Sequence, residues 1–446
     1  MAEVLDLANR IAAMARPGEE VEAYIARGRT VVVRAYEGDV ESFTSSQTAG
    51  VGIRIVRARR QGFAWAGTLD EGVVLDTLAE ARDNAAFGEI DEHNGLARLD
   101  GVPVVGVDLW REGLVTFPDH ERIARALELE RAVKEGDPRI AGVRTATYGD
   151  RAGEGAVATS NGIGVWERAT TCWVSVTALA RDGDETEVGV GVDVARQPSE
   201  LDVDGAAADA VDRATRLLGA TKPASQRLTV VFEPRMAAAV LGIVAGTLSG
   251  EAVLKGRSPF ADRVRETIAS PSLTMVDDPT DARSLAAYSH DGEGLAARRN
   301  TLIDGGVLQG FLHDSYTGRR SGTDSTGSAV RGVRSTPTPG VQALSLAPGD
   351  RSTEELLAGV ERGILVQSMT GLHSGVNPVS GDFSVGVEGL MIRDGARAEP
   401  VREVTIASTL QRLLLDIRAV GAELEWLPGG SGMATVVIDD VSLSGR

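Results

Sequence analysis

Alternating strands followed by a helix occur twice in this chain, and this order limits the fold more than any other feature. Residues 20–35 and 50–65 each alternate like a pair of strands, and residues 68–86 then repeat apolar side chains at helical spacing. Residues 157–218 follow strands with a helix in the same order. The repeated order predicts an α+β unit with an internal duplication.

The length of the chain predicts two domains, because 446 residues exceed what one hydrophobic core usually holds. A polar, proline-containing joint at residues 221–226 (TKPASQ) separates residues 1–220 from residues 227–446. Asp-Gly turns at 302–305 and 392–395 predict tight hairpins. With 53 glycines in the chain, we expect the second domain to be dominated by antiparallel sheet with a few helices.

Further helices are predicted from apolar spacing and capping signals. A capping box at residues 352–355 (STEE) predicts a helix that continues through Leu356, Val360 and Ile364. The other predicted helices cover residues 4–12, 118–134, 234–254 and 407–420.

The charge of the chain limits its partners. Lys and Arg number 46 against 64 Asp and Glu, a net charge of −18, and the sequence has no basic cluster with interleaved aromatics. We therefore expect no nucleic-acid partner. The N-terminus lacks a signal-peptide pattern, and the longest apolar run, residues 236–244, is shorter than the roughly 20 residues of a membrane span. The sequence predicts a cytoplasmic protein without membrane contact.

Metal-ligand motifs are missing from the sequence. No two of the histidines at positions 93, 120, 290, 313 and 373 have the spacing that places two imidazoles on one helix face. The single cysteine, Cys172, lies in an apolar strand, where we expect a buried core residue. Neither a Walker loop, a Rossmann glycine fingerprint nor a nucleophile elbow is present.

The segment from Asp277 to Arg331 carries the candidate functional residues. Asp277 and Asp278 precede a proline and are expected to cap a turn at a strand end. Asp291 and Glu293 would project to one side of an extended chain, which presents two carboxylates to a groove or leaves two solvated acids in a loop. Both interpretations stay open.

Glycines and hydroxyls in the same segment extend this pattern. Gly292 and Gly294 would let another backbone approach closely. Arg298 and Arg299 could neutralise the acids or orient an acidic partner. Residues 325–328 (STGS) either form a turn or offer hydroxyls and N–H groups to a bound peptide.

Taken in order, these pieces resemble the TldD/PmbA family, specifically its PmbA (TldE) branch. The likeness covers most of the C-terminal half and weaker patches of the N-terminal half, such as residues 50–57. The matching residues are DGEG at 291–294, Arg299, the hairpin at 302–305, Tyr316, Arg319, STGSA at 325–329, SGDFSVGVEG at 380–389 and PVREVTIA at 400–407.

The resemblance implies a cytoplasmic metalloprotease built from two related subunits. In the TldD-type subunit, H-E-x-x-x-H on a helix and a cysteine near the C-terminus hold zinc. Here the corresponding segments read GIVAGTLSGE at 242–251 and LPGGSG at 427–432, and Glu251 alone cannot hold the ion. We therefore expect no catalytic residue, metal ligand or cofactor in this chain, and zinc in a TldD-type partner.

The substrate that the resemblance implies is an unfolded peptide added as a strand to a sheet edge. The positions expected to line the substrate groove or an interface are Asp291, Gly292, Gly294, Thr326 and Gly327. The leading hypothesis is the non-zinc subunit of a two-chain protease. The alternatives are a self-associating, homodimeric peptide-binding protein, and an independent hydrolase with Asp291 and Glu293 as its acid–base pair.

Overall fold

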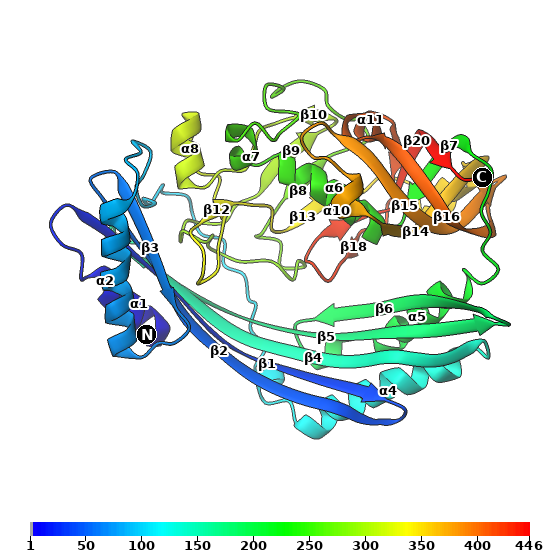
Figure 1. Ribbon diagram of the computed structural model, residues 1–446, viewed down its shortest axis with the longest axis horizontal. Coiled ribbons are helices and arrows are strands. Elements are labelled where there is room, and N and C mark those ends of the chain that lie inside the picture. The colour runs from blue at the N-terminus through cyan, green and yellow to red at the C-terminus, as the bar shows by residue number, and fades with distance from the viewer. Residues whose placement is uncertain (1–2) are drawn as a thin grey trace.

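The computed structural model describes residues 3–446, and its N-terminal half is built on one long antiparallel sheet (Figure 1). The sheet has the order β3-β2-β1-β4-β5-β6. Its strands are β1 (Glu19–Tyr36), β2 (Asp39–Arg57), β3 (Arg60–Ala66), β4 (Ile140–Thr159), β5 (Gly164–Asp182) and β6 (Glu185–Ala195). The helices are α1 (Glu3–Ala12), α2 (Glu71–Phe87), α3 (Glu112–Val115), α4 (Asp119–Gly136) and α5 (Val203–Thr215), with a 3₁₀ turn at Pro198–Glu200.

The order helix, three strands, helix occurs twice in this half, as α1-β1-β2-β3-α2 and as α4-β4-β5-β6-α5. The two copies join at the centre of the sheet, where β1 pairs with β4 and Gly28 lies opposite Gly153. The α+β fold predicted for this half is confirmed, and the repeated order is the one expected of an internal duplication.

All four long helices cover one face of the sheet, and the other face is turned to the C-terminal half (Figure 1). The odd-numbered residues of β1 face the helices: Val21, Ala23 and Ile25 pack with α1 and α2, and Val33 packs with α4 and α5. The even-numbered residues therefore face the C-terminal half, because side chains alternate along a strand.

Glycines on the third strand of each copy let its helix approach the sheet. A Cβ at Gly62 of β3 would lie 2.2 Å from the Ala81 carbonyl of α2, and one at Gly191 of β6 would lie 1.8 Å from the Ala206 carbonyl of α5. Only glycine permits such contacts, so both helices lie closer to the sheet than any other residue would allow.

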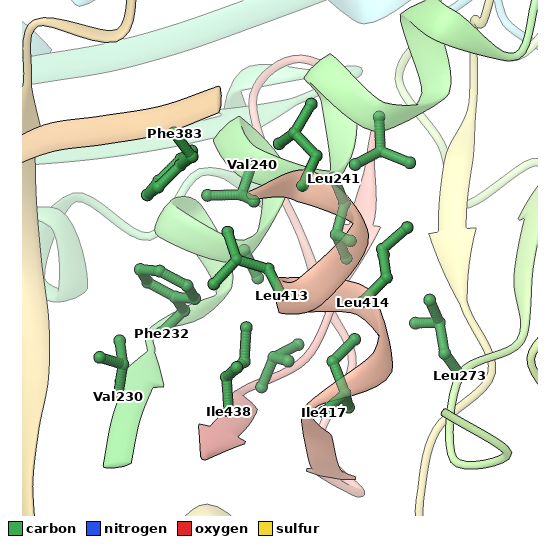
Figure 2. Close-up of a cluster of buried hydrophobic side chains, with 14 of the residues drawn as sticks. Val230, Phe232, Val240, Leu241, Leu273, Phe383, Leu413, Leu414, Ile417 and Ile438 are labelled. Carbon is green, nitrogen blue, oxygen red and sulfur yellow. The ribbon is translucent and has the colours of Figure 1, made fainter. Parts of the chain in front are cut away.

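The C-terminal half contains two further six-stranded sheets, β10-β9-β8-β13-β19-β18 and β16-β15-β14-β7-β20-β17. The second sheet closes on itself through pairing of β16 with β20. The main hydrophobic core lies between the sheets, with α6 and α11 inserted into it (Figure 2). Most strand pairs are antiparallel, as predicted; β7–β14 and β13–β19 are parallel.

The elements of this half have the following bounds. The strands are β7 (Gln226–Phe232), β8 (Met275–Asp277), β9 (Asn300–Asp304), β10 (Val307–Leu308), β11 (Ala329–Val330), β12 (Thr338–Pro339), β13 (Leu344–Leu346), β14 (Arg362–Thr370), β15 (Asp382–Arg393), β16 (Ala396–Thr409), β17 (Ile417–Val420), β18 (Glu425–Trp426), β19 (Gly432–Met433) and β20 (Val436–Ser444). The helices are α6 (Pro234–Thr247), α7 (Gly250–Leu254), α8 (Ser315–Ser321), α9 (Thr353–Ala358), α10 (Leu372–Gly375) and α11 (Leu410–Leu415).

Two predictions for the N-terminal half and the following helix were wrong. Residues 20–35 form one strand rather than a pair, because β1 continues unbroken to Tyr36 and pairs with β2 along its whole length. The helix predicted over 234–254 is broken after Thr247, where Ser249 caps the separate helix α7.

Two further helix predictions failed in the C-terminal half. The capping box at Ser352 is present, but its helix ends at Ala358, and Ile364 belongs to strand β14. The helix predicted over 407–420 shrinks to α11, since its flanks pair as strands. In the first case Leu356 and Val360 pack in one core and Ile364 in another, and in the second case a helix and its flanking strands fill the main core. Tertiary packing thus overrides the local pattern.

A buried ionic network joins the two halves. The Arg54 guanidinium on β2 bonds Glu22 of β1 at 2.8 and 3.0 Å and reaches Glu293 of the C-terminal half at 3.3 Å. Arg331 of the C-terminal half bonds the other side of Glu22. The four side chains are at most 4% exposed. Burial raises the pKa of Glu22, but Arg54 and Arg331 outweigh it and hold that pKa below its ordinary value.

The duplicated close packing predicts that Gly62→Ala and Gly191→Ala both destabilise the protein. Overpacking against a backbone should lower the free energy of unfolding by about 1–3 kcal/mol at each position. Gly72→Ala in α2 is the matched control, since a Cβ there meets nothing within 4 Å, and it should be neutral or stabilising by up to about 1 kcal/mol. Urea denaturation measures all three, and a silent Gly191→Ala would contradict the packing argument.

Removing the central cation of the ionic network should weaken the contact between the halves. Arg54→Met leaves Glu293 without its arginine and should lower the free energy of unfolding by about 3–5 kcal/mol. Arg393→Met, which removes the exposed Arg393–Glu399 pair, should cost less than about 1 kcal/mol in the same denaturation experiment. Equal effects of the two variants would refute a special role for the network.

Candidate functional site

A groove with a volume of about 940 Å³ lies between the N-terminal sheet and the C-terminal half. Its floor is the central part of the sheet, where the residues facing the C-terminal half are small: Ala26, Gly50, Gly153 and Gly155. Added Cβ atoms at Gly153 and Gly155 would meet only ordinary contacts, at 3.4 Å or more. The groove therefore exists because these strands carry almost no side chains on this face.

The walls of the groove combine aromatic rings with arginines. The Arg331 guanidinium lies 4.9 Å from the Tyr24 ring centroid, and the Arg334 guanidinium lies 4.4 Å from the Trp65 ring centroid. Arg151 of β4 lies on the same face. Glu167 and His290 face each other on the opposite wall, with 3.0 Å between Oε1 and Nδ1.

An unpaired strand edge borders the groove. Strand β2 pairs with β1 from Asp39 to Arg57, but β3 covers only residues 51–57 on its other side. Within the described part of the chain, no strand pairs with the remaining edge, residues 39–50. Residues 47–50 of this edge line the groove. Free N–H and C=O groups here can accept an added strand.

Asp291 and Gly292 line the groove, and both form hydrogen bonds within the chain itself. The Asp291 carboxylate accepts the N–H groups of Glu293, Leu295 and Ala329 at 2.9–3.1 Å. Burial and, next, the Glu293 carboxylate raise the pKa of Asp291 above its ordinary value, while these N–H groups oppose the shift. The Gly292 N–H donates to the Ala329 carbonyl at 2.7 Å, so the backbone that approaches this glycine is the chain's own.

Gly294, Thr326 and Gly327 lie away from the groove lining. Gly294 has a φ of +79°, and a Cβ there would lie 2.5 Å from Ile163 of the N-terminal half. Gly327 has a φ of +64° and lies against the Ala296 carbonyl. The Thr326 hydroxyl accepts the His313 N–H at 2.8 Å. These residues fix loops and the contact between the halves; whether any of the five predicted positions contacts substrate stays a prediction.

Two interpretations of the charged residues need correction. Glu293 is not beside Asp291 in a groove: it is fully buried, bonded to Arg54 and to the Ser315 N–H at 2.8 Å. Burial raises its pKa, and Arg54 offsets this only in part. Arg298 pairs with Asp100 at 2.5 Å and Arg299 lies 3.7 Å from Asp278, so neither neutralises Asp291 or Glu293.

Three further predictions concern Asp278, Asp277 and Cys172. Asp278 caps a turn by accepting the Thr280 N–H at 3.1 Å, as predicted. Asp277 instead binds the N–H groups of Gln342 and Ala343 on a neighbouring segment, and burial raises its pKa to about 6. Cys172 is buried as expected, and burial raises the pKa of its thiol.

Tyr316 and Arg319 have a role that the sequence alone did not reveal. The Tyr316 hydroxyl donates to Asp91 at 2.8 Å, and Arg319 donates to the carbonyls of His93 and Gly95 at 2.8 Å. Both residues thus fasten the long segment between α2 and α3 to helix α8. No local sequence signal links positions so far apart.

The described residues do not assemble a metal-ligand set. Across residues 3–446, no three His, Cys, Asp or Glu side chains lie together as a cation site. Helix α6 turns Ala237, Val240, Leu241 and Val244 into the core (Figure 2 labels two of these). His313 lies beside Thr317, at 3.3 Å. That this chain holds no zinc stays a prediction. None of the helices within residues 3–446 is long and apolar enough to cross a membrane.

The comparisons with known proteins cover nearly the whole chain. Models of the PmbA/TldA metallopeptidase family match as domain 1 over residues 21–86, as the central domain over 114–218 and as the C-terminal domain over 225–445.

Individual relatives agree with these matches. Metalloprotease PmbA of Escherichia coli O157:H7 is 26% identical over 95% of this chain and 91% of its own. The PmbA homolog of Haemophilus influenzae is 24% identical over 100% and 96%. The crystal structure of TldE from Thermococcus kodakarensis has a TM-score of 0.88 at 24% identity, covering 96% and 97%, and so shares the fold. The chain therefore belongs to the PmbA/TldD metallopeptidase family, in its PmbA/TldE branch.

Proposed function

We propose that this chain is the non-zinc subunit of a cytoplasmic two-subunit metalloprotease that degrades or processes unfolded peptides. In this proposal the groove holds part of an extended peptide, and a TldD-type partner supplies the zinc. The observation that carries the proposal is the glycine-floored groove beside the free edge of β2. Relatives named metalloproteases support a role in peptide hydrolysis.

The free edge suits an unfolded substrate. A peptide that pairs with residues 39–50 of β2 would bond through its main chain, so binding would depend little on its side chains. The small residues Gly153 and Gly155 leave room in the groove for the side chains of the added strand.

The assignment of zinc to the partner depends on two segments, α6 and the turn at 427–432, which correspond to the zinc-binding segments of a TldD-type subunit. Catalytic zinc sites generally use about three protein ligands and an open position for water. In this chain the buried residues of α6 are Ala237, Val240, Leu241, Val244, Ala245 and Thr247, with no imidazole or carboxylate among them. In the turn at 427–432, the Gly430 carbonyl accepts the Ser284 hydroxyl at 2.6 Å. We therefore assign the metal and the activated water to the partner.

One alternative has its own support. The same free edge of β2 would pair with a second copy of the chain, as in a self-associating peptide-binding protein that needs no protease partner. An independent hydrolase that uses Asp291 and Glu293 has less support, because the oxygens of both carboxylates already bind backbone N–H groups or Arg54.

Purification with and without a partner tests the assignment of zinc. The chain purified alone should contain far less than one zinc per molecule and cleave no unfolded peptide. Co-expression with an H-E-x-x-x-H homologue should give a mixed complex that cleaves the peptide and loses activity with a chelator. Metal analysis of each separated chain identifies the zinc carrier. Chelator-sensitive cleavage by this chain alone would overturn the proposal, and a stable homodimer that ignores the homologue would favour the alternative.

Filling the floor of the groove tests its role. Gly155→Val should fold, since a Cβ there meets the Ile25 carbonyl at an ordinary 3.4 Å and valine suits a strand. Its side chain would occupy the groove and should weaken peptide binding and cleavage by about tenfold, the equivalent of about 1.4 kcal/mol. Gly142→Val on the same strand, where a Cβ meets nothing within 4 Å, is the control. Unchanged binding by a folded Gly155→Val would exclude the groove.

A further inference from the structure

The groove is lined by several arginines whose donor groups are not all paired within the protein. Its wall holds Arg151, Arg331 and Arg334, although the chain as a whole has a net charge of −18. The nearby acids are already engaged: Glu167 accepts the Ser289 N–H at 2.8 Å and contacts His290, and Asp291 accepts three backbone N–H groups.

Arg331 brings donor groups without partners to the wall of the groove. Its side chain is fully buried and bonds Glu22, but its Nε and Nη2 have no partner among the described residues. Arg54 contacts both Glu22 and Glu293, so the network contains two arginines and two glutamates, and Arg331 offers the groove its free N–H groups. Buried N–H groups without acceptors favour a nearby negative charge.

Arg151 and Arg334 bring further cationic groups to the wall of the groove. Neither forms an ion pair or a side-chain hydrogen bond within residues 3–446. Arg334 stacks on Trp65, which holds the planar guanidinium in place and leaves its N–H edge free. A stacked guanidinium presents the fork of donors that a carboxylate accepts from two sides.

We infer that the groove selects peptides that carry carboxylates, and that Arg151 and Arg334 bind those carboxylates on the wall that also holds the free N–H groups of Arg331. This inference rests on the proposed function, because it names the chemical class of the peptide. The carboxylate can come from Asp or Glu side chains or from the C-terminus of the peptide. A polyphosphate is the poorer occupant, since the net charge of the chain repels a long anion and the floor is strand backbone.

Fluorescence binding of the full chain to labelled ten-residue peptides tests the inference. The peptides share one Gly/Ser/Ala background and carry three Glu, three Gln or three Lys, each with a free or amidated C-terminus. Two exposed ion pairs at up to about 1 kcal/mol each predict a preference of up to about thirtyfold for Glu over Gln at low salt. Salt near 1 M should remove most of this preference, since the screening length is then about 3 Å.

Variants identify the groups that produce the preference. Arg151→Met and Arg334→Met should each lower the affinity for the Glu peptide about fivefold, the equivalent of about 1 kcal/mol, and leave the Gln peptide unaffected. Arg334→Lys should recover part of that loss, because it keeps the charge without the planar fork. Arg131→Met on the outer helix α4 is the matched control and should change nothing. A preference that follows the free C-terminus instead of Glu supports the same site with the chain end as its source.

Three results would overturn the inference. Equal binding of the Glu, Gln and Lys peptides would show a groove that ignores charge, while the proposed peptide-binding function would stand. Tighter binding of a thymidine oligonucleotide than of the Glu peptide would show a site for nucleic acid. Failure of every peptide to bind, both to this chain and to its complex with the TldD-type partner, would remove the proposed function together with the inference.

Discussion

The contact of Arg54 with two buried carboxylates holds the rest of this structure in place. One carboxylate, Glu22, belongs to the N-terminal sheet, and the other, Glu293, belongs to the C-terminal half. Glu293 buried without Arg54 would be strongly unfavourable, so this contact stabilises the docking of the two halves. The meeting brings loop 331–334 over the sheet and so forms one wall of the groove. The position of the groove thus depends on the contact of Arg54 with Glu22 and Glu293.

Glycine has two different uses in the N-terminal sheet. On the face toward the helices, Gly62 and Gly191 allow α2 and α5 to approach the strands. On the opposite face, Gly153 and Gly155 leave the backbone uncovered and create space in the groove. Glycine therefore permits close helix packing on one face of the sheet and leaves space on the other, because a strand directs successive residues to opposite sides.

The fold of a metallopeptidase family and the chemistry of this chain can be separated. The sheets, the groove and the free edge of β2 need only backbone geometry and small side chains. A metal centre needs several donor atoms at one point, whereas α6 buries mainly apolar side chains in the core. In the proposed function, the chain keeps the surfaces for a peptide and a partner while the partner holds the reactive ion.

The sequence by itself determined the α+β class, the Asp-Gly hairpin at 394–395 with its two positive φ angles, the capping box at Ser352 and the family. These features depend on a few adjacent residues, so local rules suffice. It misplaced helices at Ile364 and at 407–420, because apolar spacing does not distinguish a buried helix from a buried strand. Only the tertiary structure paired Arg334 with Trp65 and Arg331 with Tyr24. These partners lie hundreds of residues apart, and the sequence therefore showed no basic cluster with aromatics where the folded chain has one.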